Sequence, residues 1–179
     1  MGLKFSLGRA ILLAAIVSAA SVANAAVSDQ ITVTVTIQNL SVAATGDIAF
    51  GAVTTSSATV STGSTSVQND GNITETFSLD LTDPTVWTAV QAAPSAAEEY
   101  ALLAQFNATQ PGVGTFTYVD HALSTTSTAS SASQFAGDQT GLSVPSGGTR
   151  ILWFRFNAPV STGETTEKTI VVTITGAAG

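Results

Sequence analysis

The sequence contains no cysteine among its 179 residues. This absence excludes disulfides, thiol catalysis, cysteine-held iron–sulfur clusters and the attachment of a lipid to a lipoprotein cysteine. Small exported domains often depend on disulfides for stability. We therefore expect this chain to be held by its apolar core, by backbone ladders between strands or by neighbouring subunits.

Charge is the second scarcity, at 9% of the chain against roughly 25% in an average globular domain. Serine and threonine take the place of the missing charges, which suits a protein outside the cell that packs beside copies of itself or carries sugar. After residue 25 only Arg150, Arg155 and Lys168 remain basic against twelve acidic residues, so three minus twelve gives a net charge of −9. This charge argues against nucleic acid and anionic membranes as partners, because both require clustered Lys and Arg.

Histidine occurs once, at His121, which we expect on a surface loop. A zinc site would need several carboxylate partners around it, and a Ser-His-Asp triad would need a nucleophile in a strained turn, which the sequence does not contain. No Asp-x-Asp-x-Asp calcium loop is present either. We therefore expect Glu75, Asp80, Asp83 and the pair Glu98 and Glu99 on solvated faces. The sequence predicts no enzyme, no metal site and no cofactor.

Residues 1–25 have the pattern of a secretory signal peptide. Lys4 and Arg9 precede an apolar run at 10–17, and small residues follow up to Ala25. The run is shorter than the ~20 residues that a membrane-spanning helix needs. We expect cleavage before Ala26, a secreted protein in the extracellular space or on the cell surface, and no stable membrane insertion afterwards.

Most of the remaining sequence alternates with period two, which indicates strands. Phe77, Leu79 and Leu81 lie on one apolar face of a predicted strand. The segments 150–157 and 168–176 alternate in the same way. Turn residues such as those at 70–72 separate the candidate strands. The sequence predicts an all-β fold in which residues 26–179 form a single antiparallel β-sandwich of immunoglobulin-like or jelly-roll type.

The pattern indicates the secondary structure of three further segments less directly. Residues 95–108 fit either a helix start or a strand, and we favour the strand because the surrounding segments are β. We expect a further short strand over 114–123, with Phe116 and Tyr118 on the same face. We expect residues 124–139 to form a low-complexity loop.

The opening segment DQITVTVTIQNL, residues 29–40, alternates most strictly of all. Its apolar residues occupy odd positions, namely Ile31, Val33, Val35 and Ile37, whereas Leu40 and Val42 are even. A strand over 29–43 would exceed the usual ~5–6 residues, and its two halves would face opposite sides. A bulge at Asn39 would restore one face. Alternatively, the two halves belong to different sheets or to different molecules.

Energy alone does not choose between pairing within one chain and pairing between chains. Burial of the four odd-numbered side chains contributes about 6–12 kcal/mol gross, while association costs ~4–15 kcal/mol. The segment is also uncharged and free of proline, which is the profile of a cross-β segment. An exposed strand of this kind would self-associate, so either its own domain covers it or self-association is its purpose.

Two tryptophans provide a different kind of candidate site. Trp87, and Trp153 together with Arg155, have the composition of a flat platform on which a sugar ring stacks. The alternative is that Trp153 packs against a neighbouring strand or subunit while Arg155 pairs with an acid. We favour packing, because a lone aromatic on a strand usually contacts its cross-strand neighbours.

The stretch at 26–53, followed by ETFSLDL at 75–81 and TIVVTITG at 169–176, resembles the pilin subunits of chaperone–usher fimbriae and the related spore-coat protein U type domains. In that family an alternating N-terminal segment completes the incomplete immunoglobulin-like sandwich of the next subunit. A Phe-Gly pair follows the first core strand, and Phe50 and Gly51 match it here. The chain departs from the family in lacking both its disulfide near the first strand and an aromatic residue in the last strand.

The resemblance implies a structural subunit of an extracellular filament, pilus-like fibre or surface coat. The donated residues would be Ile31, Val33, Val35 and Ile37. Its partners would be copies of itself, together with an assembly chaperone or an outer-membrane platform. A second likeness, of residues 67–81 to immunoglobulin-like accessory modules of secreted bacterial proteins, supports the alternative of a secreted carbohydrate-binding or adhesion module.

Overall fold

The structure is a computed structural model that describes residues 30–179. The signal peptide expected at 1–25 and its cleavage site lie outside the described residues. The chain divides into two units, residues 1–35 and residues 36–179.

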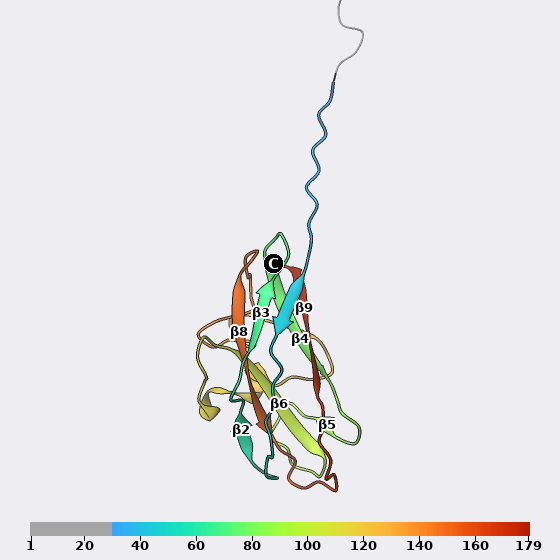
Figure 1. The fold of residues 1–179 in the computed structure, drawn as a ribbon, viewed down its shortest axis with the longest axis vertical. Coiled ribbons are helices and arrows are strands. Elements are labelled where there is room, and N and C mark those ends of the chain that lie inside the picture. Colours follow the sequence, from blue (N-terminus) through green and yellow to red (C-terminus); the bar gives the residue numbers. More distant parts are fainter. Residues whose placement is uncertain (1–29) are drawn as a thin grey trace, which may run out of the picture. The chain divides into compact units, whose positions relative to one another are not determined.

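Residues 36–179 form two β-sheets (Figure 1). The larger sheet has the order β1 (Val42–Thr45), β3 (Thr65–Asn69), β8 (Thr149–Asn157), β6 (Glu99–Phe106) and β5 (Thr88–Ala89), and β2 (Ala58–Val60) also pairs with β8. The smaller sheet has the order β7 (Thr128–Ala129), β4 (Glu75–Thr82) and β9 (Val171–Ala178). The pairs are antiparallel except for β5 with β6, which is parallel.

The core lies between the two sheets and takes side chains from both. The larger sheet contributes residues such as Val67, Leu152 and Phe154, and the smaller sheet contributes Phe77 and Leu79. Alternation on β4 and β8 directs their apolar residues to this core, as period two requires. The prediction of an all-β sandwich is therefore confirmed.

Strand β6 differs from the others because both of its faces are buried. Residues such as Tyr100 and Leu102 join the main core, while Ala101 and Leu103 form a second apolar cluster with Phe116. The prediction of a strand at 95–108 is confirmed within these bounds, but the second buried face was not expected. It explains why this segment reads as a nearly continuous apolar run.

The segment that covers the second face of β6 corrects one prediction. Instead of a strand over 114–123, the chain forms a short 3₁₀ turn, η1 (Val113–Thr115), and one helical turn, α1 (Tyr118–His121). Thr117 precedes α1, and its hydroxyl accepts a hydrogen bond from the Asp120 N–H. This side-chain cap favours the helical turn over a strand at this point.

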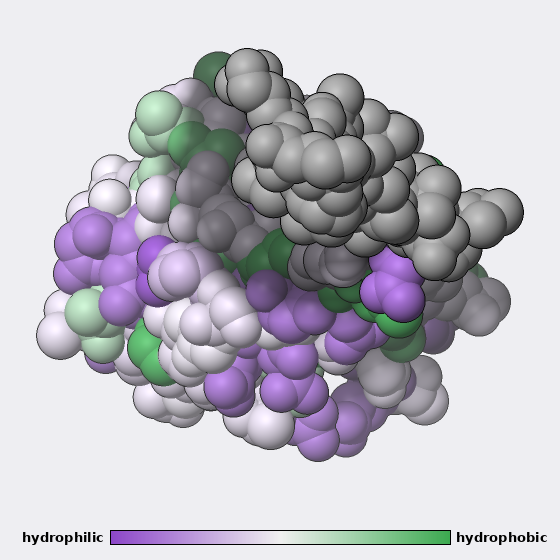
Figure 2. Space-filling view, turned by 90° about the horizontal axis from the view of Figure 1, so that it is seen from above, coloured by the Kyte–Doolittle hydropathy of each residue, from purple (hydrophilic) through white to green (hydrophobic). Residues whose placement is uncertain are grey.

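The surface combines hydrophilic and hydrophobic residues. Figure 2 shows a face on which pale, nearly neutral residues lie between separate purple hydrophilic and green hydrophobic areas. Among the described residues, an ion pair joins Lys168 Nζ and Glu164 Oε2 at 2.5 Å, four residues apart in the loop before β9. Both side chains are half-buried.

Candidate functional site: the N-terminal segment and its junction

The alternating apolar residues of the opening segment are exposed. Ile31, Val33, Val35 and Ile37 have exposed fractions of 89%, 79%, 80% and 78%. No strand is assigned to residues 30–41, and the first strand begins only at Val42. Of the strand predicted over 29–43, residue 29 lies outside the described residues, and among residues 30–43 only Val42 and Ala43 belong to a strand.

The junction between this segment and the sandwich is fixed by the turn that follows β3. The side chain of Asn72 accepts from the Asn39 N–H at 2.8 Å and donates to the Ile37 carbonyl at 2.9 Å. The Asn72 N–H donates to the Asn39 carbonyl at 3.0 Å, and the Asp70 N–H donates to the Ser41 carbonyl at 2.7 Å. Residues 37–41 are thus held by side-chain and backbone hydrogen bonds before β1 begins. We call residues 37–41 and 69–75 the junction.

Glu75 lies at the base of the junction and is fully buried. Its Oε1 accepts a hydrogen bond from the Ser41 N–H at 2.8 Å, while its Oε2 has no hydrogen-bond partner among the described residues. The expectation that this carboxylate lies on a solvated face is wrong. Glu75 has the same odd parity as Phe77, Leu79 and Leu81, so the strand pattern turns it towards the core with them.

Two glycines make room for this carboxyl group. A Cβ at Gly71 would collide with Glu75 Oε1 and with the Asn39 carbonyl, and a Cβ at Gly176 would collide with Glu75 Oε2 and with Val42 Cγ2. Asn69 supports the turn from within, since its side chain donates to the carbonyls of Ile73 and Val144. The junction is therefore closely packed and fully dependent on small residues at these two positions.

The two tryptophans belong to separate apolar clusters rather than to one platform. Trp87 is half-buried, stacks on Phe156 at a centroid distance of 6.0 Å, and donates from its Nε1 to Thr162 Oγ1 at 3.3 Å. Trp153 packs against the second cluster and donates from its Nε1 to the Asn107 carbonyl at 2.9 Å. Both tryptophans are half-buried.

Arg155 lies beside Trp153 on β8, and its hydrogen bonds go to carbonyl oxygens rather than to the expected acid. Its NH1 donates to the carbonyls of Val113 and Phe116, each at 3.1 Å, and its guanidinium lies 5.7 Å from the centroid of the Tyr118 ring. Arg155 therefore fastens η1 and α1 to the larger sheet.

His121 is buried, so the prediction of a surface loop position is wrong. Its Nδ1 accepts from the Thr117 N–H at 2.9 Å, and its Nε2 lies 3.0 Å from the Ala136 carbonyl, to which it donates. The ring also meets Phe116 edge-on. Both ring nitrogens are used in fixing α1 to the loop that follows it.

The remaining acidic candidates also have structural partners. Asp83 accepts from the Tyr100 hydroxyl at 2.8 Å and from the Ala89 N–H at 2.9 Å. Glu98 accepts from the Thr162 hydroxyl and the Gly163 N–H, and these hydrogen bonds lower the pKa of its carboxyl group below the usual value. Glu99 accepts from the N–H groups of Ser95 and Ala96, which likewise lower its pKa.

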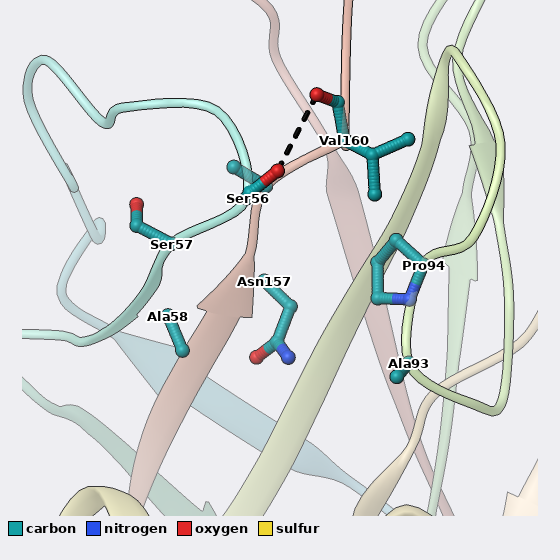
Figure 3. Close-up of a pocket in the computed structure, with 8 residues that line it drawn as sticks. Ser56, Ser57, Ala58, Ala93, Pro94, Asn157 and Val160 are labelled. Carbon is teal, nitrogen blue, oxygen red and sulfur yellow. Dashed lines mark hydrogen bonds between the residues drawn. The ribbon is translucent and has the colours of Figure 1, made fainter.

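Two surface depressions lie within residues 30–179, and their polar side chains make structural hydrogen bonds. One, of about 160 Å³, is lined by small or apolar side chains and by Asn157 (Figure 3). In it the Ser56 hydroxyl donates to the Val160 carbonyl at 3.4 Å. A second depression contains Asp138 and Arg150, which hydrogen-bond to the backbone at Ala108 and Thr140 respectively.

Within residues 30–179 no group of His, Cys, Asp and Glu side chains could hold a metal ion. In the same part of the chain, no helix is long and apolar enough to cross a membrane. Comparison of the chain with protein-family models, with curated proteins and with solved structures found no match.

Proposed function

We propose that this protein is a structural subunit of an extracellular filament, pilus-like fibre or surface coat, and that it assembles by strand complementation through its N-terminal segment. The observation that carries the proposal is the exposure of Ile31, Val33, Val35 and Ile37 on a segment that has no strand partner within residues 30–179. Four β-branched side chains on one side of a segment need an apolar surface to cover them.

Energetics is compatible with an intermolecular partner. Burial of these four side chains yields about 6–12 kcal/mol gross, and strand addition also satisfies the backbone groups of the segment and of the sheet edge that receives it. The junction lowers the cost of association, because its hydrogen bonds already hold residues 37–41. An uncharged β-prone segment left uncovered would otherwise aggregate without order.

The composition supports a location outside the cell. Residues 1–25 have the pattern of a secretory signal peptide, and the abundance of serine and threonine with few charged residues suits a protein outside the cell. The proposed partners are copies of the same chain, aided by an assembly chaperone or an outer-membrane platform. The proposed role is non-catalytic.

A pair of variants tests this function. Val33→Asp places a charge on the apolar side of the segment, whereas Thr34→Asp places the same charge one residue away on the hydroxyl side. Size-exclusion chromatography and negative-stain microscopy of the chain from residue 26 should show assembly for the parent and for Thr34→Asp. Val33→Asp should remain monomeric, as should a deletion of residues 26–38.

Two outcomes would contradict this proposal. A parent chain that remains monomeric at high concentration, with no change on deletion of residues 26–38, would remove the assembly function. Equal assembly of Val33→Asp and Thr34→Asp would show that the apolar side of the segment is not the contacting side.

A further inference from the structure

A surface depression of about 460 Å³ lies between the loop at 132–142 and the start of β8. This volume falls in the range of roughly 300–1,000 Å³ that is usual for small-molecule sites. Its walls combine apolar side chains with polar and charged ones, among them Ala132, Ala136, Leu142, Asp138, Thr140 and Arg150. The depression therefore presents charge and apolar surface within the space of one small molecule.

Arg150 brings a positive charge to this depression. Its guanidinium is held in place, since Nε donates to the Thr140 carbonyl at 2.8 Å and Nη1 donates to the Thr149 carbonyl at 3.0 Å. The side chain is half-buried, and it forms no ion pair with any carboxylate within residues 30–179. A fixed guanidinium without a carboxylate partner is suited to bind the carboxylate of a ligand.

Asp138 brings the opposite charge to the same depression. Its Oδ1 accepts from the Ala108 N–H at 2.7 Å, and its own N–H donates to Asn107 Oδ1 at 2.7 Å. Asp138 is exposed and lines the depression together with Arg150, but no ion pair joins the two side chains. Opposite charges that line one depression without pairing leave room between them for a ligand that carries both charges.

The loop that forms this depression is firmly tied to the sandwich. The Thr140 hydroxyl donates to the Ser131 carbonyl at 3.0 Å, and the Gln139 side chain accepts from the Ile151 N–H at 2.9 Å. Phe135, which is fully buried, adopts the left-handed region with a φ of 58°. Strained residues of this kind persist only where the surrounding structure holds them, and they cluster at functional sites. The two charges are therefore already in place, which lowers the cost of binding a ligand.

We propose that this depression binds a zwitterionic α-amino acid with an apolar side chain. Arg150 takes the carboxylate, Asp138 takes the ammonium group, and the apolar wall contacts the ligand side chain. A simple anion would leave Asp138 without a role, and a simple cation would do the same for Arg150. The depression includes no residue of the junction or of the segment 31–37, so this site goes beyond the proposed function and can be tested without assembly.

NMR titration of the chain from residue 26 tests the site, with leucine, valine and alanine as probes. Two analogues of leucine each lack one charge, because N-acetylleucine has no ammonium group and leucinamide has no carboxylate. We expect at least one of the three amino acids to shift the signals of Asp138 and Arg150. For leucine, each analogue should bind about tenfold more weakly, because it loses one charged hydrogen bond.

A pair of matched variants tests the role of Asp138. Asp138→Asn retains an oxygen for the Ala108 N–H and removes the charge, whereas Asp47→Asn makes the same change at an exposed residue outside the depression. Amino acid affinity should fall about tenfold in the first variant and stay unchanged in the second. Arg150→Gln should likewise weaken binding, and Arg150→Lys, which keeps the charge, should restore part of it.

Several results would overturn this site. The absence of signal shifts with leucine, valine and alanine would remove it altogether. Equal affinities for leucine and either analogue would show that the ligand is not read as a zwitterion. Equal losses in Asp138→Asn and Asp47→Asn would reduce the effect to overall charge. None of these results bears on assembly, so the proposed function stands or falls separately.

Discussion

Strand β4 and the segment 31–37 have the same alternating pattern, but the apolar residues of β4 are buried and those of 31–37 are exposed. On β4 the apolar residues Phe77, Leu79 and Leu81 are at most 2% exposed, and β7 and β9 flank the strand on both sides. The apolar residues of 31–37 are at least 78% exposed. Alternation thus decides which side of a strand is apolar, while burial depends on the strands and the sheet that surround it.

The largest expected effect contrasts one core residue with one segment residue. Leu79→Ala should lower the free energy of unfolding by about 2–5 kcal/mol, because it leaves a cavity in the main core. Val35→Ala should change it by less than about 0.5 kcal/mol in the unassembled chain, because Val35 is exposed. Urea unfolding at low protein concentration measures both. Equal losses would show that the segment covers the core of its own chain.

The next largest effect on stability is expected at Gly176, where β4, β9 and the junction meet. Gly176→Ala should cost about 1–3 kcal/mol of unfolding free energy, because the added methyl group collides with Glu75 and Val42. Gly112→Ala is the matched control, since a Cβ there meets no atom within 4 Å and the backbone φ is −70°. Thermal unfolding of the two variants gives the comparison. A neutral Gly176→Ala would show that the space around Glu75 and Val42 can accept a methyl group, against the close packing at Gly176.

A smaller effect is expected where the segment joins the sandwich. Asn72→Ala removes the hydrogen bonds to the Asn39 N–H and the Ile37 carbonyl, at a cost of about 1 kcal/mol. The Asn39 amide should then exchange its hydrogen faster, as measured by NMR. Asn72→Asp retains the acceptor for Asn39 and should preserve the protection of that amide. Unchanged exchange in both variants would contradict the role given to Asn72.

The smallest effect is a pH dependence near the loop that precedes β9. Glu98 has a lowered pKa because the Thr162 hydroxyl and the Gly163 N–H donate to its carboxylate. Its contribution to stability is therefore present above the unfolded pKa, near 4.5, and is lost as the pH falls through the lower folded pKa. Glu98→Gln should flatten the loss of stability below about pH 4.5, relative to the exposed control Glu167→Gln. Identical acid profiles for the two variants would refute this assignment.

Much of the sandwich was predictable from period-two patterns, because strands β4, β8 and β9 each bury or half-bury one parity of residues. The same pattern failed at Phe116 and Tyr118, where a side-chain cap at Thr117 produces a helical turn instead. It also did not reveal the second buried face of β6, since an apolar run does not tell how many layers cover it.

The junction was only partly visible in the sequence. The turn at 70–72 was predicted from its residues, and the odd parity of Glu75 signalled an inward carboxyl group that the sequence analysis instead assigned to solvent. Its contact with Ser41 joins residues 34 positions apart, which no local pattern encodes. In the same way, the alternation of 31–37 predicts an apolar side without specifying whose core that side covers.

Hydrogen exchange at the amides of residues 31–37, measured in assembled particles and in dissociated chains, tests the central claim most directly. The account predicts fast amide exchange across residues 31–37 in the dissociated chain. After assembly, it predicts strong protection of the amides in this segment that hydrogen-bond to a partner strand. Exchange that stays fast in the assembled particle would contradict it, because the segment would then form no strand with any partner.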